Sequence, residues 1–276
     1  MSIGLTFKRK VAERVLQTAK PYALRKLSEK RAIAAFHKLA ERSPRYREIL
    51  AMDRVAPETV GTIEAFRAQV PILTKERFFG GNRPAEWITL GGSNRPAAIN
   101  ASSGSGSHLG YSLVSRRQAR KTTSMVDLGL ALHFRIDRLK TLIINCLPMG
   151  IFVPSDTATV LNLSVREDNA IAAAAEFAES FDQLIFLSDP FFAKKLADAA
   201  IFAPVDWARY RINVLIGGEC SGENFRRYLE HAFQIDPQDP ASGSVRSSMG
   251  LGEIGLNLLF ETPKSIALAQ AANHGR

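Results

Sequence analysis

The residues best suited to chemistry are the serines and glycines between Asn100 and Gly110, which read Asn-Ala-Ser-Ser-Gly-Ser-Gly-Ser-His-Leu-Gly. Glycine lets a backbone turn tightly and approach a ligand, and successive amide N–H groups with serine hydroxyls can surround phosphate oxygens. The positions expected to hold phosphates are Ser102, Ser103, Gly104, Ser105, Gly106 and Ser107. A flexible linker is the alternative, but a place between a predicted strand (97–100) and a predicted helix (115–132) favours a phosphate loop, with the helix's positive end aimed at the ligand.

The same glycines allow a second interpretation. Gly104, Gly106 and Gly110 form a GxGxxxG pattern with Asp127 downstream, as in a nicotinamide-dependent oxidoreductase, although a glycine pattern alone is weak evidence. A Walker A loop is not expected, because no Gly-Lys-Ser/Thr follows. No serine has glycine two residues before and after it, so a serine hydrolase elbow is not expected either.

Two further glycine-rich stretches carry a glutamate. Gly217 and Gly218 precede Glu219 at the end of an apolar run, where two glycines would let a flat ring lie against the backbone. In the stretch 247–253, Glu253 follows a glycine-rich turn and could hold Mg²⁺ that also touches a nucleotide phosphate. An ordinary turn and a surface acid are the alternatives.

The elements that would position these residues alternate from residue 96 onward. Strands are predicted at 97–100, 141–146, 184–187, 212–216 and 245–249, with helices at 115–132, 167–180, 190–202 (opened by Pro190) and 221–233 (capped by Ser221). This alternation predicts an α/β fold with largely parallel sheets and helices on both faces. Ligands of such sheets bind beyond the carboxyl ends of the strands. The loops after Asn100, Ile216 and Ser248 are expected there.

The first 50 residues predict a basic helical segment. Ile3, Phe7, Val11 and Val15 recur every four residues on one helix face, and Ile33, Phe36 and Leu39 do so further on. The favoured interpretation packs these apolar faces inward and leaves the basic face in solvent. The alternatives are an amphipathic helix on an anionic membrane or acidic partner, in a weak contact through residues 2–20, and an Arg-rich transit peptide. Residues 52–98 predict loops around short elements.

Composition narrows the classes of function. The chain has 276 residues, 46% apolar, and a net charge of +9. Residues 1–50 hold 13 Lys or Arg against 4 Asp or Glu, so the remainder is neutral and nucleic-acid binding is not expected. The two cysteines are far apart, which favours a reducing, cytoplasmic location. From the residue pattern, neither a zinc site nor a membrane-spanning helix nor a signal peptide is expected.

In order and spacing, these stretches resemble the adenylate-forming enzymes, in particular the branch of phenylacetate–CoA ligase. Pro71–Lys75 is similar to the family's LPxTK segment, Ser102–Ser107 to its Ser/Thr/Gly phosphate loop, Ile216–Glu219 to its GGE strand end, Met249–Glu253 to its YGx[ST]E motif, and Leu147–Phe152 to its aromatic GLF segment. The likeness spans about residues 60 to 263.

The resemblance implies two steps. A carboxylate attacks the α-phosphate of ATP to give an acyl-adenylate and pyrophosphate, and a thiol such as that of CoA then displaces AMP. Carried over to this chain, the implied roles are phosphate binding by the Ser102–Ser107 loop, adenine contact by Gly218 and Glu219, nucleotide contact by Met249 and Gly250, Mg²⁺/ATP binding by Glu253, and an acyl pocket at Met149, Gly150 and Phe152. The implied acid is aromatic or fatty.

The sequence also departs from the family. His108-Leu109 stands where Lys-Pro is expected, Met249 replaces a tyrosine, and Gly252 replaces Ser/Thr. The expected organisation is a basic helical segment (1–50), a nucleotide- and acyl-binding domain (51–263) and a tail (264–276), without the family's mobile C-terminal domain and its catalytic lysine. Two alternatives remain: a ligase completed by a partner chain that carries this domain, or a non-catalytic relative that binds ligands.

Overall fold

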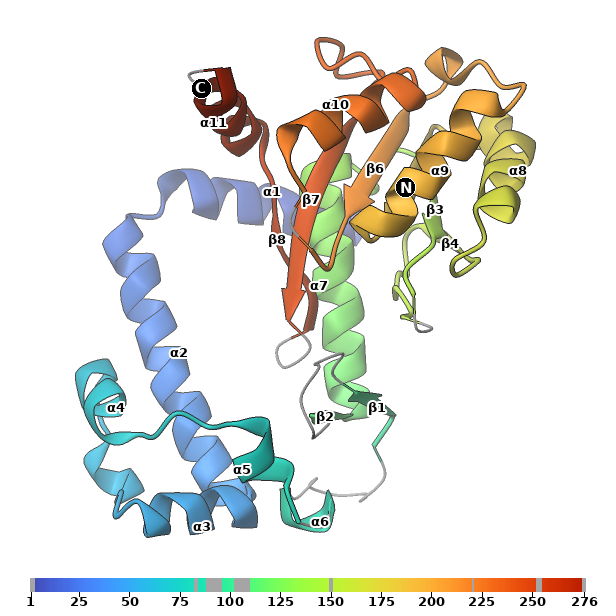
Figure 1. Ribbon diagram of the computed structural model, residues 1–276. Coiled ribbons are helices and arrows are strands. Elements are labelled where there is room, and N and C mark those ends of the chain that lie inside the picture. Colours follow the sequence, from blue (N-terminus) through green and yellow to red (C-terminus); the bar gives the residue numbers. More distant parts are fainter. Residues whose placement is uncertain are drawn as a thin grey trace. The chain divides into compact units, whose positions relative to one another are not determined.

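A computed structural model gives the structure of the chain (Figure 1). It describes residues 3–81, 84–87, 96–101, 110–148, 151–219, 221–251 and 255–274. The chain divides into two compact units, one of residues 1–13 with 120–276 and the other of residues 14–119. The domain limits expected from composition, at residues 50 and 263, stay a prediction.

The larger unit is built on one six-stranded sheet. Its strands, in spatial order, are β4 (Thr159–Asn162), β3 (Thr141–Asn145), β5 (Gln183–Ser188), β6 (Ile212–Ile216), β7 (Gly243–Leu251) and β8 (Gly255–Phe260). All neighbours pair in parallel except β7 and β8. The predicted α/β class and the largely parallel sheet are confirmed, while β4 and β8 were not foreseen.

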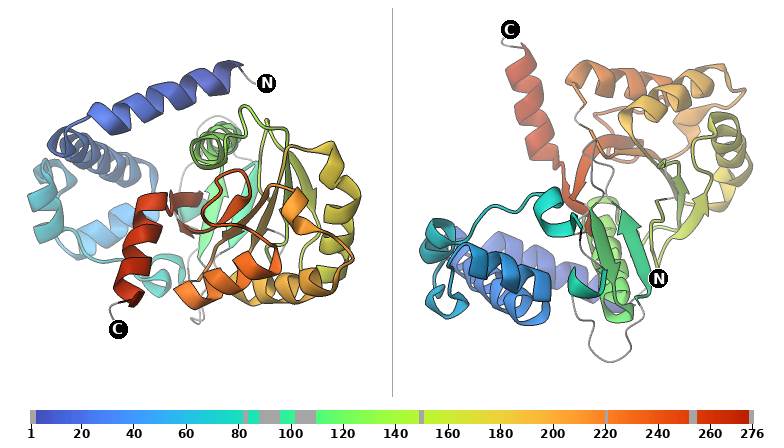
Figure 2. Two further views of the ribbon diagram at one scale, coloured as in Figure 1. Left: turned by 90° about the horizontal axis from the view of Figure 1, so that it is seen from above. Right: turned by 60° about the horizontal axis from the view of Figure 1, so that its bottom comes forward.

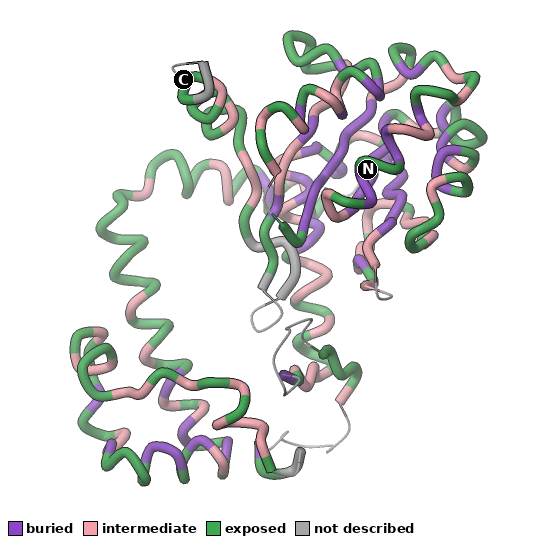
Figure 3. Tube along the Cα trace, in the orientation of Figure 1, coloured by how far each residue is buried: buried purple, intermediate pink, exposed green. Residues whose placement is uncertain are grey.

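Helices cover both faces of this sheet, as the buried strands require. They are α7 (Arg116–Phe134), α8 (Glu167–Phe177), α9 (Pro190–Phe202) and α10 (Glu223–Ala232), with short 3₁₀ turns at η2 (Ala178–Ser180) and η3 (Trp207–Arg209). Leu184 and Phe186 of β5 pack with α8, α9 and α10, whereas Ile185 and Leu187 point the other way, toward α7. Figure 2 shows α7 on the other side of the strands from α8, α9 and α10, and Figure 3 shows the central strands buried.

The starts of two helices test the predicted caps. α9 begins at Pro190, as predicted, and the Asp189 carboxylate accepts a hydrogen bond from the Phe192 amide at 3.0 Å. α10 begins two residues later than predicted, with Gly222 at its N-cap. The predicted cap by Ser221 is wrong, because its hydroxyl lies beside the hydroxyl of Ser247 instead, at 3.5 Å.

The last described helix, α11 (Pro263–His274), occupies the segment expected to be a tail. Thr262 and Ser265 hydrogen-bond to each other at its start. Gln270 Nε2 donates to Glu223 Oε1 of α10 at 2.9 Å. The segment is therefore an ordered helix fixed to α10.

The first helix, α1 (Ile3–Thr18), packs with the opposite face to the one predicted. Leu5 and Arg9 are buried, whereas Ile3, Phe7 and Val11 are exposed. Arg9 is held by an ion pair to Asp137 at 2.9 Å. The predicted inward packing of the apolar face that carries Phe7 is therefore wrong. The face of α1 that carries Arg9 packs against the protein instead.

The smaller unit is mainly helical. It contains α2 (Pro21–Arg42), α3 (Pro44–Met52), η1 (Pro57–Thr59), α4 (Ile63–Gln69), α5 (Lys75–Phe79), α6 (Pro84–Trp87), β1 (Ala98–Ala101) and β2 (Tyr111–Val114). Its core gathers Phe36, Tyr46 and Leu50, with Ile33 and Leu39 packed against it. The inward face predicted for residues 32–40 and the short elements of 52–98 are confirmed.

β1 and β2 correct the predicted topology around the Ser/Gly loop. They pair with each other in antiparallel register, Ala101 opposite Tyr111, as a separate two-stranded sheet. The side chains of β1 are exposed, unlike those of a central parallel strand. The loop therefore joins two antiparallel strands rather than a parallel strand and a helix.

Candidate functional site

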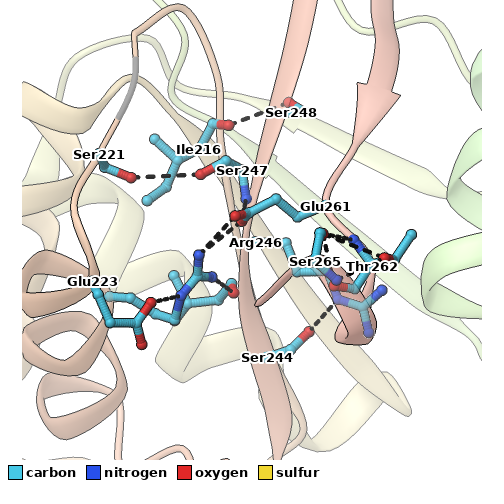
Figure 4. A network of polar contacts seen from close by, with 12 residues as sticks. Ile216, Ser221, Glu223, Ser244, Arg246, Ser247, Ser248, Glu261, Thr262 and Ser265 are labelled. Carbon is cyan, nitrogen blue, oxygen red and sulfur yellow. Dashed lines mark hydrogen bonds and ion pairs between the residues drawn. The ribbon is translucent and has the colours of Figure 1, made fainter. Parts of the chain in front are cut away.

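Two of the three predicted glycine-rich stretches meet at the carboxyl edge of the six-stranded sheet. β6 and β7 are neighbours with Ile216 opposite Ser247, so Gly217 and Gly218 run beside the residues that follow Ser247. Ser248 Oγ donates a hydrogen bond to the Ile216 carbonyl at 3.3 Å (Figure 4). The structure thus brings together residues that lie 30 positions apart in sequence, at the edge where parallel sheets bind ligands.

Gly217 and Gly218 form the turn that leaves β6. The buried Gly217 donates its amide to the Ser188 carbonyl at 2.8 Å, which ties the turn to the end of β5. Gly218 has a φ of +92°, a conformation that side chains with a Cβ rarely adopt, although the space around it is open. Gly218 and Glu219 are exposed. The two glycines carry no side chain and Gly218 is exposed, which suits contact of this backbone with a flat ring.

Met249 and Gly250 lie on β7, next to this turn. The strand was predicted to end at Met249, but it continues to Leu251. Met249 is opposite Leu259 of β8, and the register shifts between Met249 and Leu251. Both Met249 and Gly250 are exposed. Glu253, to which the resemblance assigns Mg²⁺, lies outside the described residues.

A buried arginine holds β7 and the chain after β8 against α10. Arg226 donates from Nη2 to both carboxylate oxygens of Glu261, at 2.9 and 2.8 Å, and from Nε to Glu223 at 3.0 Å. It also donates to the Val245 carbonyl of β7. Glu261 in turn accepts from the Ser247 amide at 2.6 Å. This network fixes the strand that carries Met249 and Gly250 (Figure 4).

The single cation of this network, Arg226, is shared between two carboxylates. Burial lowers the pKa of Arg226, but the hydrogen bonds that it donates to Glu261 and Glu223 outweigh that effect and leave the pKa raised. Arg226 is therefore committed to two carboxylates and is no free cation for a phosphate. Sequence reasoning missed Arg226 and Glu261, because neither stands in a recognisable motif.

Hydrogen bonds from Asn145 fix the segment that leads to the predicted acyl pocket. Asn145, at the end of β3, donates from Nδ2 to the Ile151 carbonyl at 2.7 Å and to Asn162 Oδ1 of β4 at 2.8 Å. Phe152 follows directly and is 62% exposed. Met149 and Gly150 lie outside the described residues. A polar asparagine directly after the apolar run Leu142–Ile144 was the signal in the sequence for these hydrogen bonds.

The predicted phosphate loop, Ser102 to Ser107, lies outside the described residues. It belongs to the unit of residues 14–119, whereas Gly218 and Met249 belong to the larger unit. The helix expected to follow the loop, α7, begins at Arg116 only after β2 has intervened. The contribution of that helix's positive end to phosphate binding stays a prediction.

Asp127 does not serve the dinucleotide interpretation. It is 5% exposed, and its carboxylate accepts hydrogen bonds from Ser155 Oγ at 2.5 Å, the Asp156 amide at 3.1 Å and Thr157 Oγ1 at 3.1 Å. These bonds hold the turn at 155–157 and occupy the carboxylate that a ribose would need. The loop also lacks the strand-to-helix setting of that motif.

Within the described part of the chain, no three His, Cys, Asp or Glu side chains converge as a metal site, and no helix there is long and apolar enough to cross a membrane. Cys146 is buried, and burial raises the pKa of its thiol to about 12. The thiol is therefore protonated at neutral pH and is no nucleophile.

Comparison with known proteins gives matches among solved structures alone. No protein-family model and no curated protein matches the sequence. The chain is similar to 2-hydroxyisobutyryl-CoA ligase in complex with 2-HIB-AMP and CoA in the thioesterification state, with a TM-score of 0.69 and 14% identity over 90% of this chain and 53% of that one.

Two other states of that ligase match as well. The open conformation with 2-HIB-AMP and CoA gives a TM-score of 0.60 and 12% identity, over 80% of this chain and 48% of that one. The postadenylation state with 2-HIB-AMP gives 0.60 and 12%, over 84% and 50%. The chain spans about half the length of the ligase chains that it matches. It has the α/β fold of the N-terminal domain of adenylate-forming enzymes.

Proposed function

We propose that this chain takes part in the ATP-dependent activation of a carboxylic acid as an acyl-adenylate, for transfer to CoA or another thiol. The observation that carries the proposal is the pairing of β6 with β7, which places Gly217 beside Ser248, the residue before Met249 and Gly250, at the carboxyl edge of a sheet with this fold. The resemblance had joined these same stretches from the sequence alone. The expected acid is aromatic or fatty, as in the phenylacetate–CoA ligase branch.

The proposed roles of the residues follow from their positions. Adenine lies against the exposed backbone of Gly218 and Glu219, where Gly218 itself presents no side chain. Met249 and Gly250 border the same nucleotide from β7, and Phe152 borders the acyl group. Ser102 to Ser107 hold the phosphates, and Glu253 holds Mg²⁺ with ATP. Such positioning of charge is the main source of rate in nucleotidyl transfer.

The chain is proposed to act together with a mobile domain like that of the complete ligases, supplied by another segment or a partner chain. This chain covers 48% and 53% of the two ligase chains, so each ligase chain is about twice as long as the part that matches. The loop also carries His108-Leu109 where the family has Lys-Pro, so a phosphate cation must come from elsewhere. Activity of these residues by themselves is accordingly expected to be low.

The first experiment is a thermal-shift titration of the purified chain with Mg·ATP and with two acyl-sulfamoyl-adenosine analogues, one aryl and one long-chain. A ligand at about a hundred times its dissociation constant adds roughly 2.7 kcal/mol to the free energy of unfolding, which is a visible rise in melting temperature. The stronger of the two analogue shifts would identify the class of acid.

The matched variants are Glu253→Ala and Glu176→Ala, the latter removing an exposed glutamate of α8. We expect Glu253→Ala to lose the Mg·ATP shift and Glu176→Ala to keep it, because one carboxylate is proposed to hold the metal and the other is remote in α8. Absence of any shift in the wild-type chain, with and without an added C-terminal domain of a related ligase, would favour a non-catalytic relative.

A further inference from the structure

α1 exposes an apolar stripe that nothing in the described chain covers. The stripe consists of Ile3, Phe7, Val11 and Val15, which are 83%, 69%, 46% and 46% exposed. At about 100° per residue these four side chains share one face of the helix. Four apolar side chains within about four turns of a helix are costly to leave in water. The stripe therefore has the character of a binding surface.

The stripe cannot simply be turned inward, because the opposite face of α1 is locked to the protein. Arg9 forms an ion pair with Asp137 at 2.9 Å, and both side chains are at most 1% exposed. Arg9 also pairs with Glu13 at 2.7 Å, and Glu13 lies 3.5 Å from Arg135. Rotating the helix would leave a buried charge without its partner, at a cost of several kcal/mol. The outward direction of the stripe is thus fixed by structure.

The charges around the stripe are positive. Lys8 and Lys10 lie on its two borders, Arg14 lies within it, and all three are exposed. The one acidic residue of the helix, Glu13, is already paired with arginines. The whole segment 1–50 carries 13 basic residues against 4 acidic ones. A partner that binds this surface must combine an apolar region, into which the stripe inserts, with negative charge that meets the basic side chains.

We propose that α1 binds the surface of an anionic phospholipid bilayer. The stripe enters the boundary between headgroups and acyl chains, while Lys8, Lys10 and Arg14 meet the lipid phosphates. The helix lies along the surface and does not cross it, in keeping with the finding that no described helix could span a membrane. This inference is independent of the proposed reaction, since it rests on α1 alone.

The test is flotation of the full chain with vesicles of phosphatidylcholine alone and of phosphatidylcholine mixed with phosphatidylglycerol. We expect binding to the anionic vesicles at low salt, and its loss at high salt, because the lysines act through screened charge. The double variant Ile3→Ser/Phe7→Ser should weaken binding at least about tenfold, since two apolar side chains no longer enter the bilayer.

A matched control exists on α9, where Ile201 and Phe202 are also exposed, at 45% and 87%. The variant Ile201→Ser/Phe202→Ser removes the same two side-chain types and should bind vesicles like the wild-type chain. Lys10→Glu provides a second test that leaves the apolar stripe intact, and it should weaken binding to anionic vesicles. Circular dichroism of each variant checks that the fold is kept.

Three results would overturn the proposal. One is no binding of the wild-type chain to anionic vesicles, and another is an equal loss of binding in both double variants. The third is a dimer in sedimentation velocity that Ile3→Ser/Phe7→Ser converts to a monomer, because a second copy of the chain would then cover the stripe.

Discussion

At the scale of single residues, His133 of α7 shows how packing sets the protonation of a side chain. Its ring stacks on Phe260 with the ring centroids 4.6 Å apart, and Arg246 Nη1 lies 3.3 Å from its Nδ1. Burial, and then the charge of Arg246, lowers the pKa of His133 to about 4. The imidazole is therefore neutral at pH 7, and its Nδ1 can accept from the guanidinium.

This lowered pKa predicts a dependence of stability on pH. Between pH 6.5 and about 4 the unfolded chain binds a proton at His133 that the folded chain does not, so the free energy of unfolding falls as the pH falls through this window. The loss at pH 4 is up to roughly 3 kcal/mol. Urea denaturation at pH 7 and pH 4.5 should show a smaller loss in His133→Asn, which keeps an acceptor for Arg246 but does not titrate. Equal losses in the two proteins would contradict the assignment.

At the scale of elements, the carboxyl edge depends on how β7 is joined to α10 and to the chain after β8. Arg226 bridges Glu223, Glu261 and the Val245 carbonyl while being only 5% exposed. Glu261 also pairs with Ser247 through both its amide and its carboxylate. The side chains that border the proposed nucleotide thus sit on a strand fixed by a buried ion pair.

Removing this arginine should be costly. Arg226→Ala leaves the carboxylates of Glu223 and Glu261 without their cation, and we expect the free energy of unfolding to fall by about 3 to 5 kcal/mol. The matched control is Arg166→Ala, which breaks the exposed Arg166–Asp168 pair and should cost no more than about 1 kcal/mol. Chemical denaturation of both variants gives the comparison. Similar losses would mean that the Arg226 network adds nothing beyond a surface pair.

At the scale of the whole molecule, residues far apart in sequence complete the larger unit. Arg9 and Asp137 are separated by 128 positions, yet their ion pair is almost fully enclosed. Leu5 packs in the same apolar cluster as α7 and the facing side of the sheet. α1 is therefore part of the folded body through one face and exposed through the other.

The pair should behave as a buried charge interaction. Arg9→Met leaves Asp137 charged and buried, and we expect a loss of about 3 to 5 kcal/mol in the free energy of unfolding. The adjacent exposed Lys10→Met should change it by less than about 0.5 kcal/mol. The double variant Arg9→Met/Asp137→Leu should regain much of the loss, because no unpaired charge then remains. A double variant no more stable than Arg9→Met would refute the pairing.

The sequence by itself determined the elements whose signals are local. The largely apolar runs of β3, β5 and β6 predicted buried parallel strands. Pro190 predicted the start of α9, and the two glycines after Ile216 predicted the turn at the edge of the sheet. Local periodicity is enough for these elements, because burial on both faces or a required φ leaves its mark in adjacent residues.

Only the tertiary structure decided which elements pair and which face turns inward. β1 is four exposed residues long, so its partner β2 could not be read from its own pattern. Ser221 does not cap α10 as predicted, because its hydroxyl lies beside the hydroxyl of Ser247 on β7, 26 positions away in the sequence. The period of α1 showed which residues share a face but not which face meets the protein. The position of Asp137 determines which face packs inward, because a buried arginine needs an ion-pair partner and Asp137 is the partner of Arg9.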